Sequence, residues 1–153
     1  MKDIIRIKPH HFVDIITSFG AGNTFVPHPY GHAVHTVAAR ILRDQNILLE
    51  MELGADDICT PCKHNIAGIC DDTIDTSFRP NAPSSKREWN LIIDGRWCER
   101  LKLQPGDRLT AREFCERLRD SSGDITDIYQ EIPAKLTAER AHKLKSGIKK
   151  FLE

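Results

Sequence analysis

The sequence lacks a long hydrophobic run, an excess of charge of either sign, and any internal repeat. No stretch approaches the roughly 20 apolar residues that a membrane-spanning helix needs, and the Met-Lys-Asp start has no signal-peptide pattern. Lysine plus arginine and aspartate plus glutamate number 22 each, so the net charge favours neither a nucleic acid nor an acidic membrane as partner. We therefore expect a cytoplasmic protein.

The motifs of several enzyme classes are also missing. There is no glycine-rich nucleotide loop, no Ser/His/Asp set with recognisable spacing, and no basic stripe. The length of 153 residues and the hydrophobic content of 40% are typical of one globular domain that buries its own core. We predict a single domain over residues 1–153.

Cysteine is scarce, yet three of the five cysteines lie close together. Cys59, Cys62 and Cys70 have the spacing Cys-x2-Cys-x7-Cys within residues 57–70, which we call the cysteine loop. A proline and a glycine inside it favour a folded loop over a helix. Soft sulfur ligands suit zinc or an iron–sulfur cluster and suit magnesium or calcium poorly. The pattern indicates a metal site; the alternative is three unrelated thiols.

Three thiolates leave a fourth position to be filled. Cys98 would complete an all-thiolate set for a 4Fe-4S cluster or for zinc, although a half-buried thiol beside Trp97 explains it equally well. Cys115 lies in the apolar stripe of a predicted helix and is expected to be a core residue. His64, inside the cysteine loop, either replaces a thiolate or hydrogen-bonds the sulfur atoms.

Histidine is abundant near the N-terminus, with five of the seven histidines between residues 10 and 35. His10, His11 and Asp14 share one turn of a predicted helix. We expect His10 and Asp14 on the face opposite the apolar stripe, with His11 at its boundary. Imidazoles bind metals and carry protons near neutral pH, so these residues are candidates for a pocket or a fourth ligand.

A second group of candidates follows in the Pro-His-Pro-Tyr-Gly-His-Ala-Val-His segment. It consists of His28, Tyr30, His32 and His35. They predict a second metal or a substrate pocket, and a metal-dependent enzyme based on histidines is one hypothesis for the whole chain. The alternative is that His28 is an ordinary loop residue and His32 a solvated surface residue.

Hydrophobic periodicity predicts a mostly helical α+β domain with a small β-sheet and a cysteine-rich metal loop. Alternation indicates strands, and spacings of three and four indicate helices. The expected elements are strands at 4–8 and 47–53, helices at 9–19, 31–45, 89–101 and 110–120, a short helix at 125–132 and a last helix capped by Thr137.

Several motifs in order resemble an uncharacterised family of small bacterial and archaeal proteins described as iron–sulfur-binding proteins. They are Ile-Arg-Ile-Lys-Pro-His-His near the N-terminus, the glycine-containing loop after the first helix, Gly-Ala-Asp-Asp-Ile-Cys, and Leu-Lys-Leu-Gln-Pro-Gly-Asp near residue 104. The resemblance spans roughly residues 4–120 and leaves 121–153 as a C-terminal helical extension. It implies a cluster on Cys59, Cys62 and Cys70, and a redox partner or small-molecule substrate.

The chain departs from this family pattern in two places. The family usually has a cysteine three residues after the paired histidines, where this chain has Asp14. The fourth ligand is then an oxygen of Asp14, the sulfur of Cys98, or an exchangeable group. The segment 28–35 is also richer in histidine than the family, which suggests an added function or a second metal. A structural zinc site remains the alternative to the cluster.

Overall fold

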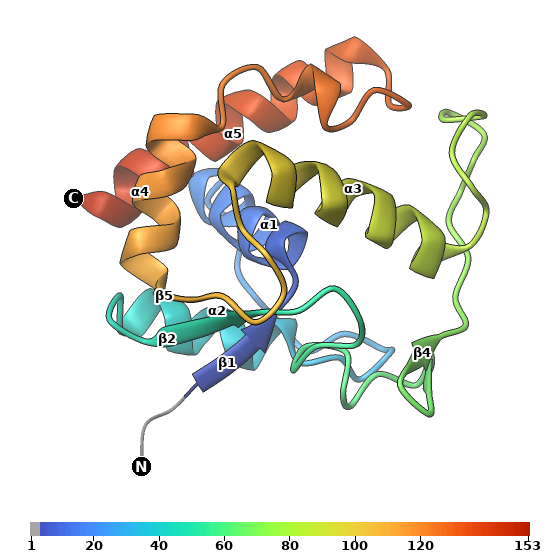
Figure 1. The fold of residues 1–153 in the computed structure, drawn as a ribbon, viewed down its shortest axis with the longest axis horizontal. Coiled ribbons are helices and arrows are strands. Elements are labelled where there is room, and N and C mark those ends of the chain that lie inside the picture. The colour runs from blue at the N-terminus through green and yellow to red at the C-terminus, as the bar shows by residue number, and fades with distance from the viewer. Residues whose placement is uncertain (1–3) are drawn as a thin grey trace.

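The larger sheet has three short strands, and helices pack against it (Figure 1). The computed structural model describes residues 4–153; residues 1–3, the start in which no signal-peptide pattern is found, lie outside the described part. The strands are β1 (Ile4–Ile7), β2 (Leu48–Met51) and β5 (Arg108–Thr110). β2 is central, parallel to β1 and antiparallel to β5. The prediction of a mostly helical α+β fold with a small sheet is confirmed.

Helix α1 (Pro9–Gly20) follows β1 after a single residue, as the sequence predicts. Pro9 is accommodated in the first turn, where a helix needs no N–H donor. Phe12 and Ile16 are fully buried on the expected apolar stripe. Helix α2 (Val34–Arg43) then completes the crossover from β1 to the parallel strand β2.

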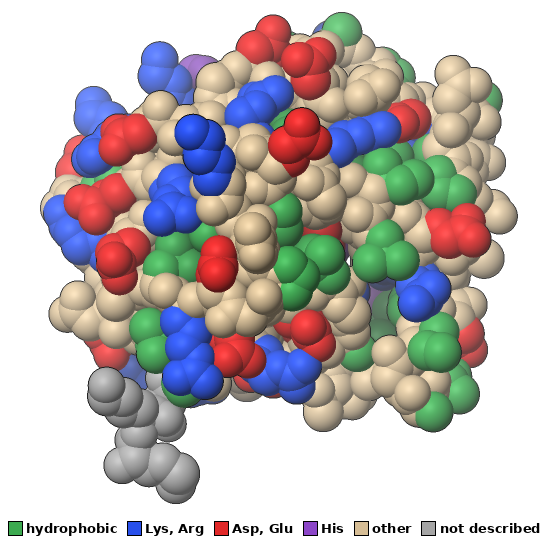
Figure 2. Space-filling model, in the orientation of Figure 1, with side chains coloured by type: hydrophobic (Ala, Val, Ile, Leu, Met, Phe, Trp, Pro, Cys, Tyr) green, Lys and Arg blue, Asp and Glu red, His purple; other side chains and the backbone are tan. Residues whose placement is uncertain are grey.

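Helices α3 (Lys86–Leu101) and α4 (Ala111–Ser121) flank β5 in the chain. The predicted capping box of α4 is confirmed: the Glu113 N–H donates to Oγ1 of Thr110 at 3.1 Å, and the Thr110 N–H donates to Glu113 at 2.9 Å. Figure 2 shows basic and acidic side chains interspersed over one face of the molecule, in keeping with their equal numbers.

The C-terminal segment differs from the prediction at two points. The helix expected at 125–132 is only a 3-10 turn, η1 (Ile125–Asp127). Helix α5 (Ala134–Leu152) begins before Thr137, which is buried in its first turn without a hydrogen bond from Oγ1 and therefore does not cap it. α5 crosses α1 closely, where Gly147 meets the backbone of Ile16, so this segment contributes to the core.

The cysteine loop ends in a small hairpin that the sequence reading missed. Strands β3 (Asn65–Ile66) and β4 (Ile69–Cys70) pair antiparallel, with Cys70 opposite Asn65. Ala67 and Gly68 both have positive φ angles, of 52° and 86°, as a two-residue hairpin turn of this kind requires. Residues 71–85 are irregular apart from an isolated bridge between Thr73 and Ser85, as expected. Over residues 4–153, no helix combines the length and apolar character needed to cross a bilayer.

Candidate metal centre

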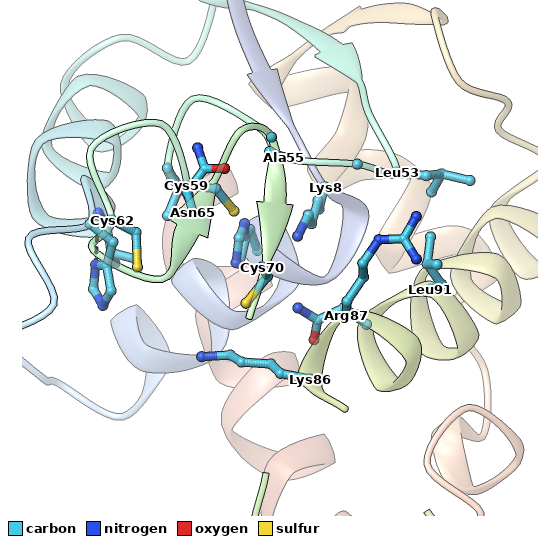
Figure 3. A pocket seen from close by; sticks show the side chains of 17 residues that line it. Lys8, Leu53, Ala55, Cys59, Cys62, Asn65, Cys70, Lys86, Arg87 and Leu91 are labelled. Carbon is cyan, nitrogen blue, oxygen red and sulfur yellow. Dashed lines mark hydrogen bonds between the residues drawn. The ribbon is translucent and has the colours of Figure 1, made fainter. Parts of the chain in front are cut away.

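The three cysteines of the cysteine loop line one cavity of about 170 Å³. The cavity lies between this loop, the junction of β1 with α1, and the first turns of α3, and Figure 3 shows the sulfur atoms of Cys59, Cys62 and Cys70 facing a common space. The polar residues that share the wall are Lys8, His11, His32, Asn65, Lys86, Arg87 and Asn90. The structure therefore brings together the three predicted thiol ligands.

Backbone hydrogen bonds within the loop hold the cysteines in place. The Cys62 N–H donates to the carbonyl of Cys59 at 2.9 Å, and the Asn65 N–H donates to the carbonyl of Cys62 at 3.0 Å. The Lys63 N–H reaches across to the carbonyl of Tyr30 at 2.7 Å. These successive turns reverse the chain twice, which is why side chains so close in sequence converge on one space.

His11 joins this cavity from the first turn of α1. Its Nδ1 donates to Oδ2 of the buried Asp56 at 2.7 Å. A ring nitrogen held by a carboxylate fixes the orientation of the imidazole and leaves Nε2 as the nitrogen available to a metal. A nitrogen of His11, an oxygen of Asp56 and Sγ of Cys59 lie within 4.8 Å of one another.

Asp56 organises the start of the cysteine loop. Its carboxylate accepts the backbone N–H groups of Lys8 at 2.7 Å, Ile58 at 3.1 Å and Cys59 at 3.0 Å. Burial alone would raise the pKa of Asp56, but His11 and the N–H of Lys8 hold that pKa well below its usual range. Asp56 therefore stays ionised and is an orienting residue whose oxygens are already occupied by donors.

Burial shifts the pKa values of two residues at the site, Cys59 and His32. Burial and the carboxylate of Asp56 raise the pKa of the Cys59 thiol to about 11. A metal cation reverses this preference, because a coordinating thiol gives up its proton. Burial and the nearby His28 lower the pKa of His32, which keeps its imidazole neutral. The donor set is thus suited to thiolate and imidazole ligation.

Zinc and iron–sulfur clusters both take thiolate and imidazole ligands. Among the described residues, ligand atoms of His11, Asp56 and Cys59 lie within 4.8 Å of one another. This set shares Cys59 with the three cysteines that line the cavity.

The structure does not bring the two predicted fourth ligands to the cavity. Asp14 pairs with Arg140 of α5, with Oδ1 and Nη1 2.9 Å apart. Cys98 is buried in α3, eight residues beyond Asn90 and so about 12 Å farther along the helix axis. Neither lines the cavity, whereas His11 does.

The prediction that His10 lies on the face of α1 opposite the apolar stripe, available to a pocket, is wrong, because His10 is buried. It is 6% exposed, and its Nδ1 lies 2.8 Å from Oδ2 of the buried Asp94 in α3. Its backbone N–H also donates to Asp94, at 2.7 Å. Because α3 covers this side of α1, His10 is a structural link between two helices and lines no part of the cavity wall.

The second histidine group is only partly assembled at the site. The rings of His28 and His32 stack with centroids 4.4 Å apart, and His32 lines the cavity. Tyr30 packs edge-on against His64, whose Nδ1 donates to Asp71 at 2.8 Å outside the cavity. His35 lies apart, in a shallow hollow with Phe19 and other residues, and Cys115 is a fully buried core residue, as expected.

Sequence reasoning missed the polar residues around the cysteines. The wall residues Lys8, Lys86, Arg87 and Asn90 come from two separate segments. Asp56, from a third segment, accepts the N–H of Lys8 beside the cavity, and only the fold brings these segments together. Asp56 had one local signal: an aspartate three residues before Cys59 is well placed to accept that residue's backbone N–H in a turn.

Comparisons with protein-family models, with curated proteins and with solved structures give no match. The family resemblance therefore stays a prediction.

Proposed function

We propose that this protein binds an iron–sulfur cluster through Cys59, Cys62 and Cys70, with His11 as the fourth protein ligand. The observation that carries the proposal is the convergence of three thiols and one carboxylate-oriented imidazole on one cavity. Thiolates are the usual ligands of such clusters, and imidazole replaces thiolate on iron in some of them. His11 takes the role for which the sequence suggested Cys98 or Asp14.

The residues of the site fit such a group in two respects. Asp56 holds the ring of His11 through Nδ1, which directs the other nitrogen outward for a metal. Apolar side chains, among them Leu53 and Ile58, form part of the wall and limit the access of water. When bound, an iron–sulfur cluster supplies one-electron transfer, or a Lewis-acidic iron where a ligand is exchangeable.

A structural zinc site is the second candidate. It is favoured by the ligand atoms of His11, Asp56 and Cys59, which lie close enough together for one ion. It is weakened by the hydrogen bonds that Asp56 already accepts, since a ligating oxygen would have to give up some of them. A zinc ion would pin the cysteine loop and supply no redox chemistry.

Serine substitutions test the cluster proposal directly. We expect Cys59→Ser, Cys62→Ser and Cys70→Ser each to lose most iron and acid-labile sulfide from anaerobically purified protein, because the thiolates act as one set. Cys98→Ser and Cys115→Ala are the controls and should retain both. Full cluster content in Cys62→Ser, or equal losses in Cys98→Ser and Cys62→Ser, would overturn the ligand assignment.

His11→Ala tests the fourth ligand. It should retain part of the iron while changing the electron paramagnetic resonance signal of the reduced protein, because one iron loses its nitrogen ligand. Asp14→Ala should leave that signal unchanged. An unchanged signal in His11→Ala would remove His11 from the ligand set and leave an exchangeable group in its place.

A further inference from the structure

The cavity of the candidate metal centre has a second, cationic side. Lys8, Lys86 and Arg87 line it, and no aspartate or glutamate is among the residues of its wall. In Figure 3 Arg87 lies on the side of the cavity away from Cys62, and Lys8 lies between Cys59 and Arg87. Ligand-binding clefts lined by charge of one sign concentrate ligands of the opposite sign.

Lys8 is the most informative residue on this side. It is only 4% exposed, yet its ammonium group has no hydrogen bond or ion pair with any residue of the described chain. The nearby carboxylate of Asp56 is occupied by three backbone N–H groups and by His11. Lys8 helps to hold the pKa of Asp56 low but makes no hydrogen bond to its carboxylate, so the three N–H donors of its ammonium group are left to bind an occupant of the cavity that carries negative charge.

Asn90 points to the same conclusion independently. It is 6% exposed on α3 and lines the cavity, and its side-chain amide has no hydrogen-bond partner in the described chain. The amide offers two N–H donors. Arg87 lies one turn earlier on α3, is exposed, and lines the cavity at its solvent side. Its planar guanidinium can donate two parallel hydrogen bonds to a carboxylate or a phosphate group.

Lys86 contributes less positive charge to the cavity than Lys8 and Arg87 do. Its Nζ lies 3.4 Å from Oδ2 of Asp72, so its charge is partly balanced already. The uncompensated cationic charge of the cavity therefore belongs to Lys8 within and Arg87 at the mouth.

We propose that this side of the cavity binds a small oxyanion, a short carboxylate or an inorganic oxyanion, beside the cysteine centre. The ammonium of Lys8 and the amide of Asn90 donate hydrogen bonds to the oxygens of the anion. The guanidinium of Arg87 binds the anion from the solvent side. A cavity of about 170 Å³ is smaller than the 300–1,000 Å³ of typical organic-ligand pockets, which limits the anion to a few heavy atoms. This inference names the substrate class of the proposed function and rests on it for the neighbouring metal.

Calorimetric titration under anaerobic conditions and constant ionic strength tests the proposal. The probes are inorganic phosphate, acetate and malonate, added to the protein as purified and again after chelation of its metal. At least one probe should bind with one-to-one stoichiometry, and the comparison of phosphate with the carboxylates identifies the class. Absence of binding by all three probes in both states would overturn the proposal.

Matched lysine variants separate the site from general surface charge. Lys8→Met removes the buried ammonium but keeps its length and its backbone N–H, whereas Lys135→Met removes an exposed charge at the start of α5. We expect Lys8→Met to weaken the anion about tenfold or more, Asn90→Leu to weaken it severalfold, and Lys135→Met to have little effect. Equal effects of the two lysine variants would contradict the assignment.

Iron and sulfide analysis of the same samples distinguishes the two proposals. Saturable anion binding that depends on Lys8 in a protein without iron supports the oxyanion site and removes the cluster. A protein with iron and sulfide that binds none of the probes supports the cluster and removes the oxyanion site; Lys8 then serves only to balance the charge of the centre.

Discussion

The Nδ1 atom of His11 lies 2.7 Å from Oδ2 of Asp56, and this contact ties the first turn of α1 to the entrance of the cysteine loop. The neighbouring residue, His10, contacts a different acid, Asp94 of α3. Two adjacent histidines thus have separate tasks. His11 lines the cavity of the candidate metal centre, and His10 holds α1 against α3.

Asp56→Asn should weaken metal binding about 10- to 100-fold, because the amide no longer supplies the charge that orients and polarises the imidazole of His11. Asp57→Asn is the matched control: it removes the same charge from the next residue, whose carboxylate accepts the N–H of Arg6 at 2.9 Å. Competition with a calibrated chelator measures the affinity of each variant. Equal affinities of the two variants would contradict an orienting role for Asp56.

Asp94→Ala should lower the free energy of unfolding by about 3 kcal/mol, because His10 would be left buried without its partner. Asp127→Ala, at a side chain that is 88% exposed, should change it by less than about 0.5 kcal/mol. Urea denaturation followed by the fluorescence of the buried Trp89 and Trp97 measures both. A small effect of Asp94→Ala would mean that α1 and α3 are held together without this pair.

Two glycine-to-alanine substitutions should change the stability of the protein in opposite directions. A Cβ on Gly147 would collide with the carbonyl oxygen of Ile16, so Gly147→Ala should destabilise the protein by about 2 kcal/mol or more. Gly95 in α3 has nothing within 4 Å of the same position, so Gly95→Ala should stabilise it by about 0.5–1 kcal/mol through helix propensity. Thermal denaturation measures both, and a neutral Gly147→Ala would refute the close crossing of α1 and α5.

The ion pair between Glu131 and Arg96 should make the stability of the protein depend on pH. Its carboxylate accepts two hydrogen bonds from Arg96, both at 2.7 Å, and these bonds hold its pKa below the ordinary value of 4.5. A carboxyl group whose pKa is lower in the folded than in the unfolded state stabilises the fold at pH values above its unfolded-state pKa. This stabilisation is lost as the pH falls through its folded-state pKa. Glu131→Gln should therefore cost about 1 kcal/mol at pH 7 and nothing in strong acid.

The control for this effect is Glu139→Gln, at an exposed position on α5. Its difference from the unmodified protein in the free energy of unfolding should be small, because surface substitutions away from specific contacts change stability little. The measurements run from pH 3 to pH 7. Urea denaturation across that range gives both curves. If the Glu131→Gln difference persists at the acid end, the ion pair does not stabilise the folded state in the manner described.

Local signals in the sequence predicted local structure well. The capping box of Thr110 and Glu113 depends on residues three apart, and it forms as expected. The spacing of the cysteines predicted their convergence for the same reason. Thr137 shows the limit of such rules: it has the right residue type for a cap, but the helix starts earlier because Pro133 already supplies the N-terminal boundary.

Features that depend on packing between distant segments could not be predicted in this way. The periodicity of α1 placed His10 on a polar face, but α3 covers that face and Asp94 meets the imidazole there. The sequence made Asp14 a ligand candidate, but in the fold its carboxylate pairs with Arg140 of α5. The cationic side of the cavity joins Lys8 to Arg87 across nearly eighty positions of the chain, and no local pattern links them.

The central claim is most directly tested by the iron and acid-labile sulfide content of the unmodified protein after anaerobic purification, read together with its visible absorption spectrum. We predict iron and sulfide in equal amounts and a broad brown absorption that is lost on exposure to a chelator and oxidant. Stoichiometric zinc without iron or sulfide, in a colourless protein, would contradict the cluster and establish the structural zinc site in its place.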